Sequence, residues 1–209
     1  MKKLSAVFAI LILLCAFRVS AEGDKARQLT LSGLDKKLTD GSYLTSADCG
    51  EIKISADGEI SSLYIIFHSK AQEFKVKSGE KTKTVKTDFL HTLTDVSELK
   101  SNDLTVDFGG AKISDVYAFS AGTLPDFVQN WEKPLERADI LLNSSHSDDD
   151  QLFFAGLLPH YAARGCDIEV VYYTDHKNEP RRPHELLNGL WTVGIKYYPV
   201  INNFPDYYS

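Results

Sequence analysis

The spacing of apolar residues changes near residue 123, and this change constrains the fold more than any other feature of the chain. Before it, short β-rich segments such as 63–67 and 104–108 alternate with turn signals. Gly109-Gly110 is one of the turn signals that we expect to separate two strands. Several short strands at this spacing predict an antiparallel β sandwich or jelly roll over residues 22–125.

After the change, strand-like and helix-like segments alternate, which is typical of a parallel α/β layer. Residues 126–137 are expected to form a linker, and residues 138–209 the start of an α/β domain. The expected elements are, in chain order, a buried strand at 138–143, a helix at 150–164 that ends at Gly165, a strand at 167–173 and a helix at 182–193 that ends at Gly194.

The N-terminus has the features of a secretory signal. Two lysines precede an apolar run from Leu4 to Phe17, and small residues lead up to Ala21, where we expect cleavage. The apolar run is too short to span a bilayer comfortably, so we expect no transmembrane span in the mature form. The sequence therefore predicts a secreted or periplasmic protein.

The charge of the chain argues against nucleic acid as a partner. The 209 residues carry a net charge of −6, and removing residues 1–21 takes away three basic residues and no acid, which leaves −9. No basic patch offsets this charge. Cys49 and Cys166 could pair in an oxidising compartment, but they lie in different predicted domains.

Residues 140–156, ILLNSSHSDDDQLFFAG, place one histidine and three consecutive aspartates between two apolar segments. Carboxylates so close together repel one another, and a metal ion would offset their charge. In open α/β sheets, ligands bind where strands reach their carboxyl ends, and the cluster follows the first expected strand. The loop after the second strand should lie at the same edge.

The spacing within the cluster suits a zinc hydrolase. If the turn leads into a helix, His146 and Asp149 are three residues apart and point the same way. An imidazole and a carboxylate are common zinc ligands. Asp148 would point elsewhere and take a proton from a water, as a general base does. The alternative is that these aspartates only cap the following helix and favour its dipole.

Three motifs in this part of the chain occur in a fixed order: His146-Ser-Asp-Asp-Asp after a hydrophobic strand, then Arg182-Pro-His-Glu185, then Val193-Gly-Ile195. They resemble, respectively, the His-Pro-Asp-Asp-Glu signature, the Arg-x-x-Glu helix and the Leu-Gly-Val segment of the LmbE-like (PIG-L) N-acetylglucosaminyl deacetylases. The resemblance covers about residues 138–209 and implies a Rossmann-like LmbE-type domain. The preceding β domain lies outside it and is similar, at most, to galactose-binding jelly rolls.

The resemblance implies a zinc-dependent hydrolase that removes an N-acetyl group from an amino sugar or a glycan that contains one. His146 and Asp149 would be zinc ligands and Asp148 the general base. Arg182 would face the sugar or its substituent, through its planar donors. Asp206 would be an acidic residue on the substrate side.

The sequence departs from the family pattern at three points. Ser147 replaces the usual proline, and Asp150 replaces the glutamate with an arm one methylene shorter. The third zinc ligand of the family, a histidine later in the domain, has no counterpart before Ser209. We therefore expect the N-terminal portion of a longer enzyme. His176, in the second loop, is a conceivable substitute ligand.

The other histidines carry little signal in the sequence. His184 is expected on an exposed face of its helix. His68 and His91 belong to the predicted β domain, where nothing marks them as functional.

Two other functions are compatible with the same residues. A metal-dependent esterase could act on acetylated sugars through the same site. A non-catalytic, secreted carbohydrate-binding protein could instead use aromatic side chains of the β domain, although strand aromatics more often belong to the core. The aromatic residues concerned are Tyr43, Tyr64, Phe67 and Tyr117.

Overall fold

The computed structural model describes residues 24–174 and 179–205. The predicted signal segment, His176 and Asp206 lie outside the described residues. In the described residues, no helix combines the length and apolar character needed to cross a membrane.

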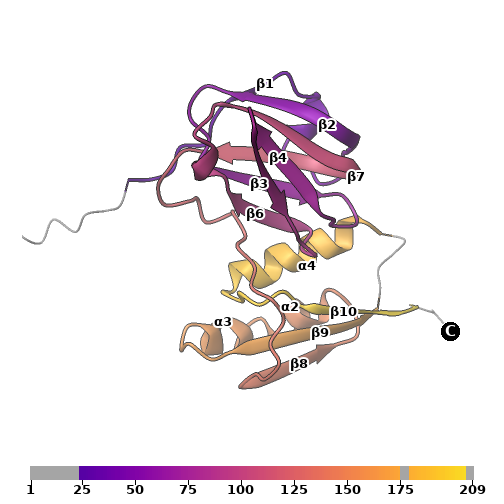
Figure 1. The fold of residues 1–209 in the computed structure, drawn as a ribbon. Helices are drawn as coiled ribbons and strands as arrows, with labels where there is room; N and C mark the ends of the chain where they lie inside the picture. The colour runs from indigo at the N-terminus through magenta and orange to yellow at the C-terminus, as the bar shows by residue number, and fades with distance from the viewer. Residues whose placement is uncertain (1–23, 175–178, 206–209) are drawn as a thin grey trace, which may run out of the picture.

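The N-terminal part is β-rich, as predicted, and its strands all pair antiparallel (Figure 1). The sheet runs in the order β1-β2-β7-β3-β6, and the hairpin β4–β5 also pairs with β7. This arrangement is compatible with a β sandwich, while the narrower jelly-roll assignment stays a prediction. The elements are β1 (Leu31–Ser32), β2 (Ala47–Ala56), β3 (Ser62–Phe67), β4 (Phe74–Ser78), β5 (Lys81–Val85), β6 (His91–Asp95), β7 (Asp103–Phe119) and the 3-10 turns η1 (Lys36–Leu38) and η2 (Ser97–Leu99).

The long strand β7 organises this domain. Its first half pairs with β2 and β4, and its second half pairs with β3. The prediction that Gly109-Gly110 separates two strands is wrong. Both glycines have positive φ, 61° and 87°, and they lie opposite a register shift between Cys49 and Glu51. The chain thus bends through a bulge and stays paired.

Aromatic side chains fill the core of the β domain. Phe67, Phe74 and Phe108 are fully buried, and their ring centroids lie 5.4–6.4 Å apart. Tyr64 is buried as well. Two of the four aromatic residues proposed for a sugar-binding β domain, Tyr64 and Phe67, are therefore core residues.

The C-terminal part has the predicted alternation of strands and helices. Its three strands are parallel and lie in the order β10-β9-β8. The strand β10 was not predicted, and the Rossmann-like LmbE-type assignment stays a prediction. The elements are β8 (Ile140–Ser144), α2 (Asp149–Phe154), α3 (Leu157–Ala162), β9 (Ile168–Thr174), α4 (Arg181–Thr192) and β10 (Val200–Phe204).

The helix expected at 150–164 is instead two short helices. Gly156 lies between them and disfavours a helix interior. Pro159 has no N–H, so it cannot donate the helical hydrogen bond to the carbonyl of Ala155. The expected end at Gly165 is confirmed, because the second of these short helices, α3, stops at Ala162 and Gly165 adopts a φ of 76°.

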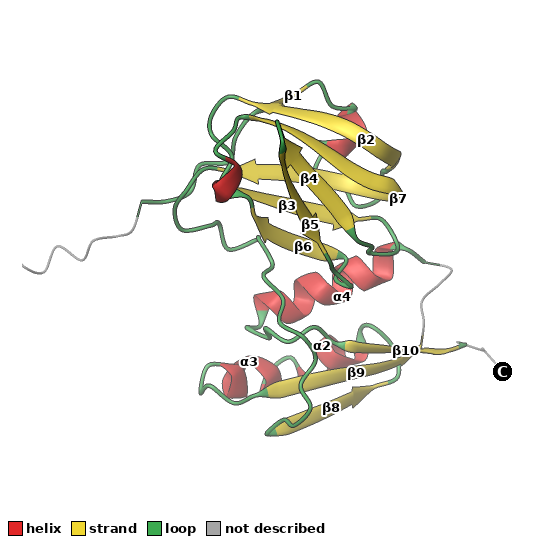
Figure 2. Ribbon diagram, viewed as in Figure 1, coloured by secondary structure: helices red, strands yellow, loops and turns green. Residues whose placement is uncertain are grey.

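The helix α4 lies between the β domain and the three-stranded sheet (Figure 1 and Figure 2). Leu186, Leu187 and Leu190 are buried and belong to one cluster of contacting side chains that includes residues of both sheets. A unit of about 70 residues has a marginal core by itself, and this packing extends it. Cys49 and Cys166 are free thiols, so no disulfide links the two parts.

Candidate active site

The predicted site lies at one edge of the three-stranded sheet, where β8 and β9 reach their carboxyl ends. We call this edge the rim; it consists of residues 145–150, Thr174 and Arg182. The turn after β8 is tied to the end of β9, because the carbonyl of Ser145 accepts hydrogen bonds from the N–H (3.2 Å) and the hydroxyl (2.9 Å) of Thr174. The two parallel strands therefore fix the turn that carries the aspartates.

His146 and Asp149 lie together on the rim, as predicted. The Nδ1 atom of His146 is 3.7 Å from Oδ2 of Asp149. The same Oδ2 accepts hydrogen bonds from the backbone N–H groups of Ser145 (3.0 Å) and His146 (2.9 Å). These bonds hold the carboxylate against the turn through Oδ2.

The chemistry of this pair fits zinc. Two ligands on a tetrahedral ion, each bonded at about 2.1 Å, are separated by about 3.4 Å. The 3.7 Å between His146 Nδ1 and Asp149 Oδ2 is close to that separation. Among the described residues, no group of three or more His, Cys, Asp or Glu side chains is arranged to hold a metal ion. The zinc-ligand roles of His146 and Asp149 stay a prediction.

Asp148 points away from the ligand pair and toward α4. Its Oδ2 lies 3.4 Å from Nη1 of Arg182. The same Nη1 donates to the Ser147 hydroxyl at 3.4 Å, and Nε of Arg182 donates to Glu179 at 3.2 Å. The Glu179 hydrogen bond, followed by that of Asp148, raises the pKa of Arg182. Asp148 and Asp149 therefore have different partners, while the roles of general base and zinc ligand stay predictions.

The helix-capping alternative receives less support from the geometry. Asp148 occupies the N-cap position of α2, but its side chain makes no capping hydrogen bond. Asp149 and Asp150 lie in the first turn, where their charge is favourable. However, α2 is only six residues long, and Asp149 bonds backward to the turn.

Asp150 forms the floor of the rim. It is 0% exposed and accepts a hydrogen bond from the Gln151 side chain at 2.6 Å. Its Oδ1 and the hydroxyl of the buried Tyr172 find no hydrogen-bond partner among the described residues. Burial raises the pKa of Asp150, and the Gln151 hydrogen bond opposes that rise.

The remaining predicted residues differ in outcome. Arg182 joins the rim, as described above. Glu185 pairs with Arg181 at 3.2 Å on the exposed face of α4, which is a structural role. Asp206 and His176 cannot be placed, since both lie outside the described residues.

A second feature, which sequence reasoning missed, is a chain of hydrogen bonds between the β domain and α4. The Tyr64 hydroxyl lies 2.7 Å from Nδ1 of His91, Nε2 of His91 lies 2.9 Å from Nδ1 of His184, and Nε2 of His184 lies 3.0 Å from the carbonyl oxygen of His68. Because a carbonyl only accepts, His184 carries its proton on Nε2. Its Nδ1 then accepts from His91, whose own Nδ1 accepts from Tyr64.

Both histidines of this chain are neutral in the fold. His91 is 2% exposed and His184 is 0% exposed. Burial lowers the pKa of His184 to about 4 and holds the pKa of His91 well below its usual range. The expectation that His184 is exposed is therefore wrong. Its spacing of three residues from Leu187 places it on the buried face, and this was the available signal.

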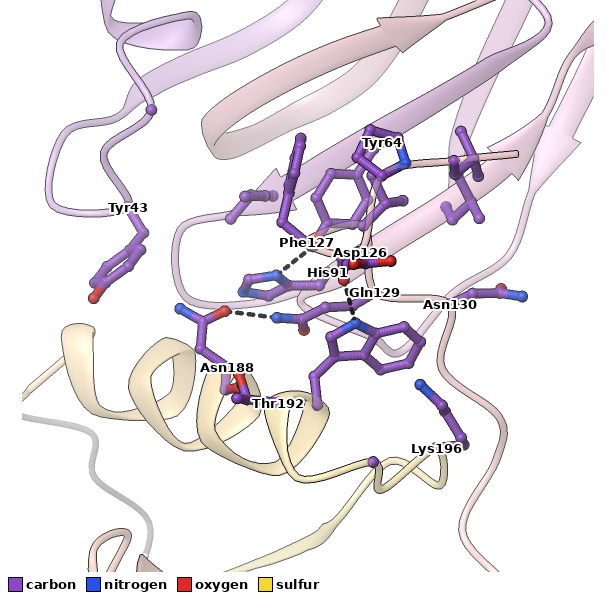
Figure 3. A pocket seen from close by; sticks show the side chains of 18 residues that line it. Tyr43, Tyr64, His91, Asp126, Phe127, Gln129, Asn130, Asn188, Thr192 and Lys196 are labelled. Atoms are coloured by element: carbon purple, nitrogen blue, oxygen red, sulfur yellow. Dashed lines mark hydrogen bonds between the residues drawn. The ribbon is translucent and has the colours of Figure 1, made fainter. Parts of the chain in front are cut away.

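Beside the histidine chain lies a groove of about 890 Å³ between the β domain and α4 (Figure 3). Its walls come from strands β3 and β6, from residues 124–130, from the second half of α4 with the turn after it, and from the loop that carries Gly41 and Tyr43. The segment 126–137 was expected to be only a linker. In fact Val128, Gln129 and Trp131 are buried, so the linker is part of this junction.

No protein-family model matches the chain, and no curated protein matches it. Similar solved structures include CpGH89 from Clostridium perfringens in complex with its substrate GlcNAc-alpha-1,4-galactose, with a TM-score of 0.34 and 12% identity over 69% of this chain. Another is a family 89 glycoside hydrolase from the same organism in complex with PUGNAc, with a TM-score of 0.34 and 11% identity over 68%. The alignments cover 19% of those chains. Such scores do not establish a shared fold, and the function is inferred from the residues themselves.

Proposed function

We propose that this protein is a secreted zinc-dependent hydrolase that removes the acetyl group from an N-acetylated amino sugar. One observation carries the proposal. At the carboxyl edge of a parallel sheet, His146 and Asp149 face each other at 3.7 Å, while Asp148 between them points to Arg182. A histidine and a carboxylate this close can supply two of the three protein ligands of a catalytic zinc ion, and the separately directed carboxylate beside them can serve as the general base.

His146 and Asp149 would hold the zinc. Zinc bound there would polarise the acetyl carbonyl and lower the pKa of water. The side chain of Asp148 is half exposed, so it can reach a water beside the ligand pair. As general base, Asp148 accepts the proton of the water that attacks the amide carbon. It then returns that proton to the nitrogen as the C–N bond breaks, and acetate and a free amine leave.

Arg182 is proposed to bind the substrate and position the base. Its guanidinium has five N–H donors, and those pairing with Asp148, Ser147 and Glu179 use only Nη1 and Nε. Among the described residues the Nη2 donors have no partner, so they can bind a hydroxyl or carbonyl oxygen of a sugar. Because α4 is packed against both sheets, the guanidinium is presented from a rigid element.

The test is release of free amine from N-acetylglucosamine-containing oligosaccharides by the zinc-loaded protein. Asp148→Asn keeps the shape but cannot accept the proton, so we expect at least a hundredfold lower kcat with zinc content unchanged. Glu59→Gln, which neutralises an exposed carboxylate of the β domain, is the matched control. Wild-type activity in Asp148→Asn would refute the role of this carboxylate.

The same assay separates the esterase function. Amide and ester substrates of equal sugar structure are offered in parallel. Faster cleavage of the O-acetyl sugar with no amine release from the N-acetyl sugar would assign the site to esters.

A further inference from the structure

We propose that the groove between the β domain and α4 is a binding site for a neutral sugar, separate from the rim. The inference goes beyond the proposed hydrolysis and does not depend on it. It rests on the side chains that line the groove and on what their polar atoms contact (Figure 3).

Phe127 gives the groove an aromatic ring that is both fixed and accessible. Phe127 is 47% exposed although it belongs to an aromatic cluster. Its ring centroid lies 5.6 Å from that of Tyr117 and 6.4 Å from that of Tyr64, both in edge-on geometry. These contacts hold the ring in place, and its exposed part offers an apolar surface to the C–H face of a sugar.

The amide of Asn188 is oriented in advance. Its Oδ1 accepts a hydrogen bond from Nε2 of Gln129 at 2.6 Å. Gln129 is buried, and its Oε1 accepts from Nε1 of Trp131 at 2.8 Å, so both ends of that amide are committed. The Nδ2 donors of Asn188 have no hydrogen-bond partner among the described residues. A buried network thus fixes a donor group in the groove wall.

The groove also carries acceptors and further donors. Asp126 and Asn130 are exposed, and among the described residues their side chains make no hydrogen bond. The Lys196 ammonium lies 3.5 Å from the centroid of the Trp191 ring, which keeps it at the groove. One carboxylate, one ammonium and two amides therefore line the same groove as an apolar ring.

This combination favours a neutral sugar over other ligands. Sugar hydroxyls both donate and accept, so they can satisfy the carboxylate, the amides and the ammonium together. A purely apolar ligand would leave these groups unpaired, at a cost in binding. An anion would lie beside Asp126 with only Lys196 to offset that charge.

The groove and the rim are at opposite ends of α4. Arg182 lies at the start of the helix and Trp191 near its end, nine residues later. At a rise of about 1.5 Å per residue, about 14 Å of helix separates them. Substitutions at one site can therefore be tested without touching the other.

The experiment is a titration of the full chain with three neutral oligosaccharides, N,N′,N″-triacetylchitotriose, lactose and maltotriose, followed by the fluorescence of Trp191 and Trp131. We expect at least one of them to bind with a Kd in the millimolar range or below. Phe127→Ala should weaken that Kd at least tenfold. Phe153→Ala removes a phenylalanine that is 74% exposed on α2, away from the groove, and should leave the Kd unchanged.

Asp126→Asn, an exposed position, gives a second variant that does not depend on packing, and it should weaken binding several-fold. His146→Ala should leave sugar binding in the groove unchanged even where it abolishes zinc binding at the rim. The groove proposal and the hydrolase proposal can therefore be refuted independently. No binding of any of the three sugars to the folded wild type would overturn the groove proposal. So would an unchanged Kd in Phe127→Ala, or loss of binding in His146→Ala, which would place the sugar at the rim.

Discussion

His91 and His184 are joined by a 2.9 Å hydrogen bond between Nε2 of the first and Nδ1 of the second, across the junction of the β domain and α4. Both rings are buried and neutral, and Tyr64 and the His68 carbonyl complete their hydrogen bonds. Protonating either ring would place a buried charge in this chain and remove an acceptor. The junction is therefore sensitive to pH.

The first prediction concerns that sensitivity. The pKa of His184 is about 4 in the fold and about 6.5 in an unfolded chain. The fold favours the neutral ring. The contribution of His184 to the free energy of unfolding is therefore fully present above pH 6.5, and it is lost as the pH falls through 4. We expect a loss on the order of 3 kcal/mol from this group, measured by urea unfolding at several pH values.

The titration of Asp115 changes the stability in the opposite direction, so its effect must be separated from that of His184. Burial raises its pKa to about 6, so protonation between pH 6 and 4 stabilises the fold. The comparison of wild type with His184→Asn cancels this effect, since Asp115 is present in both. The stability difference between the two proteins should shrink as the pH falls from 7.5 to 4. A difference independent of pH would contradict the neutral histidine chain.

The second prediction concerns the shared core. Leu187 on α4 is fully buried within the cluster that spans both sheets. Leu187→Ala should lower the free energy of unfolding by about 2–5 kcal/mol. Because the core is continuous, both parts should lose stability in a single transition, seen alike by circular dichroism and by tryptophan fluorescence. Two separated transitions in the wild type would show that the parts fold independently.

The third prediction concerns a glycine in the strand-to-linker turn. Gly122 has a φ of 132°, and a Cβ there would lie 2.2 Å from the carbonyl oxygen of Asp24. Gly122→Ala should therefore cost roughly 2 kcal/mol or more, through backbone strain and displacement of the N-terminal segment. Gly156→Ala is the matched control, because a Cβ at that position meets no atom within 4 Å and the φ is −85°. It should be neutral or stabilise slightly, and equal losses in both variants would argue against this explanation.

The fourth prediction concerns Arg182. Arg182→Lys keeps the charge but cannot bridge Asp148, Ser147 and Glu179 with one planar group. We expect kcat/KM for amine release to fall about tenfold to a hundredfold, mostly through KM if the role is substrate binding. Arg181→Lys is the control and should keep full activity, because among the described residues the Arg181 side chain pairs with Glu185 and not with the rim. Equal effects of the two substitutions would deny Arg182 a special role.

Much of the fold could be predicted because local signals agreed with tertiary packing. The segments at 63–67, 167–173 and 182–193 are strongly apolar or strongly periodic, and each forms the expected element within one or two residues. Gly109-Gly110 failed as a turn signal because positive φ serves a bulge as well as a turn. The strand at 200–204 escaped notice because two asparagines interrupt its apolar pattern.

The candidate site likewise has features that the sequence could predict and features that it could not. The turn and the following helix bring His146 and Asp149 together through local spacing, which a sequence can convey. The contact between Asp148 and Arg182 joins residues 34 positions apart and depends on where α4 packs. The histidine chain and the groove depend on contacts between the β domain and α4, for which one sequence offers no local pattern.

The central claim is that His146 and Asp149 hold a zinc ion, and zinc titration of the purified chain by calorimetry tests it most directly. Wild type should bind one zinc per chain, and His146→Ala and Asp149→Ala should each weaken that binding at least tenfold. Asp148→Asn should bind zinc as wild type does. Absence of zinc binding, or equal binding by wild type and both ligand variants, would contradict the account.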